Sequence, residues 1–302
     1  MSNLVNAFIN NLLPILLAAG VGALLGKFKL VQVESLSRIV LYVLTPCLVF
    51  NMLTKSPVSG ATTLTMLGFT IALMVCVALL TGLIGFLLKW DSSLIAAAIL
   101  TSMATNAGNY GLSLNKFAFG DSVLPYATLF MVANSMMTYT LGIVVASWGA
   151  HRKTNPLLAP FKYPFIYAFI LALIFNYFKV GLPLPVDRVV SLFSDAAIPM
   201  MLLVLGLQLV NCPWRKLTLP MVATNMIRLL GSPSIALGLS VLFALSGPAR
   251  QAGILQSAMP TAVTAILLAT EFNLQVNFVT FAVAVTTVLS FITLTPLITL
   301  LS

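Results

Sequence analysis

The run Thr105–Gly111, with the sequence TNAGNYG, lies inside an otherwise apolar segment that extends from Leu94 to Phe119. We expect its two amides, two glycines and threonine to lie at the depth of a lipid bilayer. A helix through lipid satisfies its backbone groups internally, and a break is tolerated only beside protein or a water-filled cavity. Glycine also weakens a helix by about 1 kcal/mol relative to alanine. We interpret the run as a helix interruption that lines a cavity.

The rest of the chain has the composition of a membrane protein. Of its 302 residues, 60% are hydrophobic and only 7% are charged, whereas soluble domains carry about 25% charged residues. The formal net charge of +9 does not indicate nucleic-acid binding, because the cations are scattered in ones and twos between apolar runs and form no basic patch. Such scattered cations are typical of orientation signals.

Apolar runs of bilayer-spanning length predict an all-α polytopic protein with ten membrane spans. The predicted spans are 8–26, 34–53, 62–88, 94–118, 122–148, 164–179, 189–210, 218–245, 250–270 and 275–300. With the N-terminus outside, the inside loops hold eight cations and the outside loops hold five. The positive-inside rule therefore predicts both termini outside and a cytoplasmic connector at 151–163. We expect the protein in the plasma (inner) membrane.

The two halves of the chain repeat one another. Three matches occur in order at nearly one offset: Glu34 and Pro46 with Asp187 and Pro199 (153), AILTS at 98–102 with GILQS at 253–257 (155), and Pro14 with Pro164 (150). Residues 1–150 and 164–302 are therefore expected to be two five-helix repeats. Because five is odd, the second repeat enters the membrane inverted. Inverted repeats with paired broken helices are typical of secondary transporters.

The repeat assigns a partner to the interruption in the fourth span. At an offset of 155, Thr105 and Asn106 correspond to Pro260 and Thr261 in the ninth span. Proline removes a backbone donor and clashes with the preceding turn, so it breaks or kinks the helix. Two broken helices that cross would bring half-helix N-termini together, each with about half a positive charge and free N–H groups, which suits a carboxylate.

Several polar side chains are placed to serve such a site. Asn106, Asn109, Thr261 and Thr264 would cap half-helices or donate to substrate oxygens. A pair of packing kinks with satisfied amides is the alternative. The candidate substrate-binding residues are Asn106, Gly108, Asn109, Tyr110, Pro260, Thr261, Thr264, Asn134 and Asn51.

Asn134 and Asn51 are the more peripheral of these candidates. Asn134 lies in the middle of the fifth span, and its repeat counterpart is Val288, beside Thr287. Its amide either lines the pathway or bonds a neighbouring helix for about 0.6 kcal/mol. Asn51 lies near the end of the second span, where an amide is easily accommodated.

Two charges are predicted at depth. Arg228 lies about 15 Å into the eighth span, and Asp195 about 12 Å into the seventh. Buried charges in a membrane are paired or functional. Arg228 therefore either forms an ion pair with Asp195 or faces the crossing helices and attracts an anionic substrate.

Three segments carry a family resemblance: NAGNYGL at 106–112, LTPCLVF at 44–50 and MPTA at 259–262. They resemble the signature segments of the auxin efflux carrier family, which includes bacterial organic-acid permeases and plant auxin exporters. The resemblance covers all ten spans, and the chain departs from it at Ser113, where the family usually has proline. It implies a fold like that of sodium/bile-acid symporters, with a scaffold of spans 1, 2, 6 and 7. A transport domain of spans 3–5 and 8–10 and a homodimer through the scaffold are also implied.

The sequence lacks the motifs of other classes of activity. It has no phosphate-binding loop for ATP, and its single histidine supports neither a metal site nor a nucleophilic triad. We expect no enzyme activity and no cofactor, and coupling to Na⁺ or H⁺ stays open. The prediction is a secondary transporter of small organic anions, preferentially carboxylates such as dicarboxylates or auxin-like monocarboxylates, that moves its transport domain as an elevator. A sodium-coupled symporter of the bile-acid type and a non-transporting receptor or scaffold are the alternatives.

Overall fold

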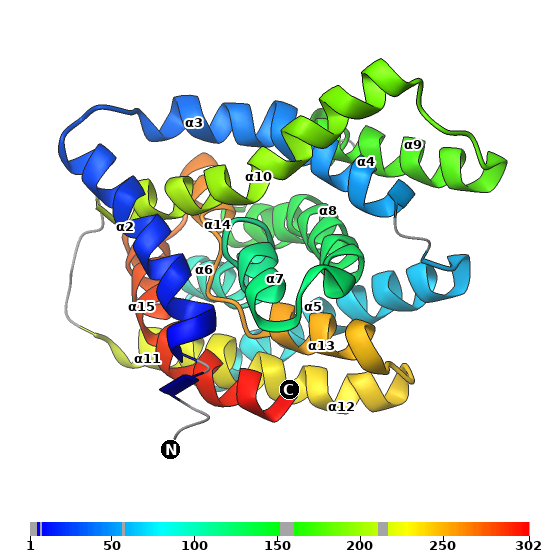
Figure 1. The fold of residues 1–302 in the computed structure, drawn as a ribbon. Helices are drawn as coiled ribbons and strands as arrows, with labels where there is room; N and C mark the ends of the chain where they lie inside the picture. The colour runs from blue at the N-terminus through cyan, green and yellow to red at the C-terminus, as the bar shows by residue number, and fades with distance from the viewer. Residues whose placement is uncertain (1–4, 7, 56–57, 152–159, 211–216, 302) are drawn as a thin grey trace.

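The structure of the protein, a computed structural model, describes residues 5–6, 8–55, 58–151, 160–210 and 217–301 (Figure 1). Most of the predicted connector 151–163 and Cys212 lie outside the described residues. The described part of the chain is helical, and its only β-type pairing is an isolated antiparallel bridge between Thr105 and Thr261.

Within the residues that the structure describes, seven helices are long and apolar enough to cross a membrane. These helices are Phe8–Lys27, Val33–Lys55, Gly60–Leu87, Asp121–Gly149, Leu184–Val210, Leu219–Leu242 and Val276–Leu301. They agree with seven of the ten predicted spans to within a few residues, except that Leu184–Val210 begins five residues early. The protein is therefore a polytopic membrane protein.

The other three predicted spans are short or interrupted. Helix α9 (Pro164–Phe178) has 15 residues. Span 94–118 is divided into α6 (Ser92–Met103), the π-helix η3 (Ala107–Leu112) and α7 (Ser113–Phe119), and span 250–270 into α13 (Gly247–Ser257) and α14 (Thr264–Glu271). The interruptions fall where the sequence predicts them.

The long helices carry the labels given next, and some of them are divided into two or three elements. They are α2 (Leu13–Lys27), α3 (Val33–Ile39), α4 (Thr45–Lys55), α5 (Gly60–Leu87), α8 (Leu124–Gly149), α10 (Leu184–Val210), α11 (Leu219–Met226), η6 (Ile227–Gly231), α12 (Ser232–Leu242) and α15 (Val276–Leu301). In Figure 1, α3, α4, α9 and α10 form the upper edge and α11 with α12 the lower edge. The short helices α6, α7, α13 and α14 lie between these edges.

Close packing joins α2 to α10 in one group of helices. A methyl group added at Gly22 would overlap the carbonyl oxygen of Leu203, and one added at Gly206 would overlap that of Ala19. Small residues at such positions let two backbones approach closely in a membrane. Within the same group, α4 packs against α9 and α10. Between α4 and α9, the rings of Phe50 and Phe175 meet edge to face with their centroids 5.2 Å apart.

The second group surrounds the interrupted helices. Helices α5, α6 and α8 pack against one another, and α13 packs against α8 and α12. The ring of Phe69, fully buried, contacts both Phe130 and Phe243 at the centre of this group. Capping side chains help to fix where helices start. The Asp91 carboxylate, for example, caps α6 by accepting from the Leu94 N–H at 3.0 Å.

Candidate functional site

The candidate site begins at the interruption between α6 and η3. Helix α6 ends at Met103, and Ala104 takes an extended conformation with φ −80° and ψ 105°. Asn106 precedes η3 with ψ 57°, outside the helical region. The backbone is therefore non-helical over 104–106, and it needs hydrogen-bond partners from elsewhere in the protein.

The interruption between α13 and α14 supplies these partners. The Asn106 N–H donates to the Pro260 carbonyl at 2.8 Å, and the Ala262 N–H donates to the Ala104 carbonyl at 2.9 Å. The two breaks thus form a short antiparallel ladder, which we call the 105/261 bridge. The Thr261 hydroxyl adds a bond to the Thr101 carbonyl at 2.8 Å, one of the carbonyls that a helix end leaves without an intrahelical partner.

Side chains of α8 and α15 hold the outer edges of the 105/261 bridge. The Asn134 amide acts as a peptide group: its Nδ2 donates to the Thr105 carbonyl at 3.1 Å, and its Oδ1 accepts from the Thr105 N–H at 3.3 Å. On the other side, the Thr286 hydroxyl accepts from the Thr261 N–H at 3.2 Å. Asn134 therefore bonds a neighbouring segment, and Thr286 binds the other side of the bridge at Thr261.

Arg228 is fully buried in η6 and bonds both broken helices. Its Nη1 donates to the Ser102 carbonyl at 2.6 Å, and its Nη2 donates to the Ser257 carbonyl. Nη2 also donates to the Ser232 hydroxyl at 2.7 Å. Ser102 and Ser257 lie at the C-terminal ends of α6 and α13, the first halves of the two interrupted spans.

The ion pair predicted between Arg228 and Asp195 is not formed. Asp195 is exposed on α10, and the ion pairs in the described part of the chain involve neither residue. The physical reason is that helix-end carbonyls carry partial negative charge and already bind both Nη groups of the guanidinium, whereas the buried Nε has no partner among the described residues. Arg228 is also absent from the lining of the cavity described below.

Gln256 is a site residue that the sequence did not single out. Its side chain is fully buried, and its Nε2 donates to the carbonyls of Ala107 and Ala127 at 3.1 and 3.2 Å. A methyl group added at Gly111 would overlap its Oε1. Gly111 therefore leaves room for Gln256 to join α13 to the start of η3. Its amide within the predicted ninth span, four residues before Pro260, was the available signal.

A cavity of about 330 Å³ reaches one end of the bridge. It lies between α10 on one side and α14 and α15 on the other, and Asn106 is its only lining residue from the 105/261 bridge. Its polar lining consists of Glu34, Asn106, Gln208, Thr280 and Thr287. Asn106 is 7% exposed, and its side chain has no hydrogen bond to other residues that the structure describes. The buried Oε1 of Gln208 also lacks a partner among them. The amide of Asn106 is therefore available to a small polar molecule in the cavity.

Comparison with known proteins shows the family. Residues 7–157 and 155–298 match the family described as membrane transport protein. The chain belongs to the auxin efflux carrier family. An uncharacterized transporter of Methanothermobacter thermautotrophicus is 26% identical over 86% of both chains. A putative malonate transporter of Rhizobium meliloti is 23% identical over 88% of this chain and 86% of its own. Auxin efflux carrier component 6 of Arabidopsis thaliana is 26% identical over 57% of this chain and 30% of its own.

As a member of the auxin efflux carrier family, the protein is a multi-pass membrane transporter and not an enzyme. The other predicted site residues are buried to different degrees. Asn109, Gly108 and Thr264 are half-buried. Tyr110 is fully buried, with its ring 5.9 Å from that of Phe291 and its hydroxyl accepting from Ser290. It therefore belongs to the core.

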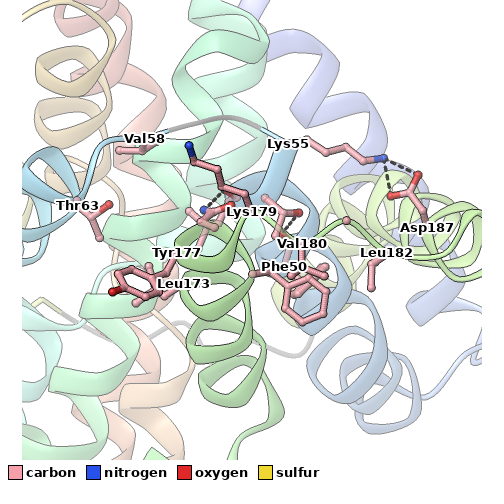
Figure 2. Close-up of a pocket in the computed structure, with 16 residues that line it drawn as sticks. Phe50, Lys55, Val58, Thr63, Leu173, Tyr177, Lys179, Val180, Leu182 and Asp187 are labelled. Carbon is pink, nitrogen blue, oxygen red and sulfur yellow. Dashed lines mark hydrogen bonds and ion pairs between the residues drawn. The ribbon is translucent and has the colours of Figure 1, made fainter.

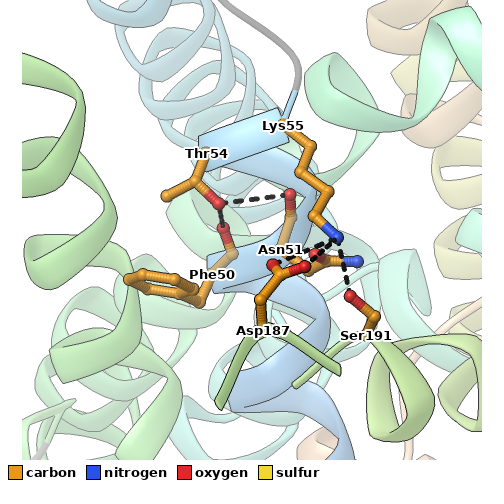
Figure 3. A network of polar contacts seen from close by, with 6 residues as sticks. All are labelled: Phe50, Asn51, Thr54, Lys55, Asp187 and Ser191. Atoms are coloured by element: carbon orange, nitrogen blue, oxygen red, sulfur yellow. Dashed lines mark hydrogen bonds and ion pairs between the residues drawn. The ribbon is translucent and has the colours of Figure 1, made fainter. Parts of the chain in front are cut away.

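Asn51 lies beside a second, larger pocket of about 740 Å³ at the junction of α4, α9 and α10 (Figures 2 and 3). The Lys55 ammonium lies 3.2 Å from the Asp187 carboxylate and donates to the Ser191 hydroxyl at 2.6 Å. Asn176 donates to the Leu53 carbonyl nearby at 2.8 Å. None of the residues of the 105/261 bridge lines this pocket. We therefore assign the candidate site to the smaller cavity at Asn106.

Proposed function

We propose that this family member is a secondary transporter of small organic anions, with carboxylates as the preferred class, and that the substrate binds in the cavity at Asn106. The observation that carries the proposal is the free amide of Asn106 at the start of η3, facing a cavity beside the 105/261 bridge. The Nδ2 group can donate to a carboxylate oxygen. The first N–H groups of a helix lack intrahelical partners and favour negative charge.

The charge balance of the site is compatible with an anion. Arg228 balances the two helix C-termini beside the bridge, at Ser102 and Ser257, so these ends leave no net negative charge there to repel an anion. Glu34, the one charged residue of the cavity lining, is exposed on α3. The names of the Rhizobium and Arabidopsis relatives, a putative malonate transporter and an auxin efflux carrier, fit the same substrate class.

We further propose ten spans in two inverted repeats, with α6–η3–α7 and α13–α14 as the crossing broken helices of spans four and nine. The pairing of Asn134 and Thr286 with opposite strands of the bridge supports the repeat. In this proposal α2, α3–α4, α9 and α10 form the scaffold and the homodimer contact. The other helices form a transport domain that carries the substrate across as an elevator. The protein lies in the inner membrane with both termini outside.

Uptake by proteoliposomes tests the proposed function. The panel contains malonate, indole-3-acetate, a neutral sugar and a cationic amine, with empty liposomes as background. We expect saturable uptake of at least one carboxylate, and a reduction of at least about tenfold in Asn106→Ala, which removes one hydrogen bond to a charged group. Asn176→Ala is the matched control, since Asn176 lies in the larger pocket. Uptake of only the neutral or cationic solute would refute the carboxylate preference.

A further inference from the structure

Arg228 uses ligands of an unusual kind for a buried cation. Its partners are two main-chain carbonyls and one hydroxyl, and the described part of the chain offers it no carboxylate partner. Both carbonyls lie at helix C-termini, Ser102 in α6 and Ser257 in α13. Each such end carries about half a negative charge. Together they balance the single charge of the guanidinium.

The same ligands suit a mobile alkali cation. In transporters with interrupted helices, half-helix C-terminal ends and unwound carbonyls coordinate coupling ions. The Ser232 hydroxyl, which also donates to the Ser257 carbonyl at 2.9 Å, would complete an oxygen-lined site. Here the guanidinium fills this position from η6, and its charge is covalently attached to the protein.

We propose that Arg228 is a tethered cation that takes the place of a coupling sodium ion beside the 105/261 bridge, so that transport requires no Na⁺. The claim that transport requires no Na⁺ rests on the proposed function. The claim that Arg228 occupies a cation position rests only on its contacts. Because the cation never leaves the protein, it neutralises the helix ends throughout the transport cycle. Because the guanidinium occupies this position, a sodium ion cannot bind there, and the proposal excludes sodium coupling through this position.

A stability measurement tests the structural part without any substrate. Arg228→Ala leaves two helix ends and Ser232 without their cation, so we expect a lower Tm. Methylguanidinium or Na⁺ at ten times its Kd should raise the Tm of this variant by about 3–5 °C. The same salts should leave the wild type and Arg250→Ala unchanged, since Arg250 is exposed. Choline chloride controls for ionic strength. A variant insensitive to both cations would overturn the tethered-cation proposal.

A flux measurement tests the transport part. Wild-type uptake of the carboxylate should be equal in NaCl and choline chloride, and a tenfold loss without Na⁺ would overturn the proposal. This arm decides the matter even when Arg228→Ala does not fold. If no carboxylate is transported in either salt, the proposed function fails, whereas the Tm response of Arg228→Ala still reports on Arg228. Arg228→Lys keeps the charge and should stay Na⁺-independent, and a sodium requirement in this variant would count against the proposal.

Discussion

Replacing Gly111 with alanine tests the contact that joins α13 to the start of η3. The added methyl group would overlap Gln256 Oε1, and it would lie 2.9 Å from Gln256 Cδ and 3.2 Å from the Asn106 carbonyl oxygen. The buried Gln256 side chain must then move and give up its bonds to Ala107 and Ala127. Each buried polar group left unsatisfied costs about 1–3 kcal/mol.

With partial relaxation, we expect Gly111→Ala to lower the free energy of unfolding by about 2–4 kcal/mol. The Tm of the purified protein in detergent, followed by tryptophan fluorescence, should fall by about 5–10 °C. Gly20→Ala is the matched control, because a methyl group at Gly20 meets nothing within 4 Å. The combined variant Gly111→Ala/Gln256→Ala should be within about 1 kcal/mol of Gln256→Ala alone, because neighbours that clash are not additive. Equal losses in Gly111→Ala and Gly20→Ala would refute this reasoning.

Three further predictions concern other contacts. Asn134→Ala removes both bonds to Thr105 and should destabilise the protein by about 1–3 kcal/mol, and a Tm unchanged in a thermal-shift assay would contradict it. Lys55→Ala should cost less than about 1 kcal/mol, since the pair with Asp187 is exposed, and a larger loss in the same assay would show that the pair supports the junction of α4 and α10. Gly206→Ala should separate α2 from α10 and lower the Tm by several degrees, whereas an unchanged Tm would mean that the two helices do not pack as closely as described.

The interruptions were predictable because polar and glycine residues are conspicuous in apolar spans. The run at Thr105–Gly111 indicated one break, Pro260 indicated the other, and the repeat offset paired them. The same offset did not point to Thr286, which bonds the backbone of Thr261 as Asn134 bonds that of Thr105.

The partners of Arg228 could not be predicted in the same way. A charge-pairing argument considers only acidic side chains, and it offered Asp195 as one of two alternatives. The actual partners are main-chain carbonyls of Ser102 and Ser257, which have no signature in the sequence because every residue carries one. The residues that line the cavity were equally hard to predict. Gln208 lies at the end of a long apolar helix, and only the packing of α10 beside α14 and α15 brings it near Asn106.

Substrate protection of an introduced thiol tests most directly whether a carboxylate binds at the 105/261 bridge. Val263→Cys lies in the cavity lining and Val180→Cys in the larger pocket, each in a background with Cys47, Cys76 and Cys212 replaced by serine. Saturating malonate or indole-3-acetate should slow maleimide labelling of Val263→Cys by at least about tenfold, as expected for a site that is mostly occupied, and should leave labelling of Val180→Cys unchanged. Protection of Val180→Cys alone, or of neither variant, would contradict the proposed site.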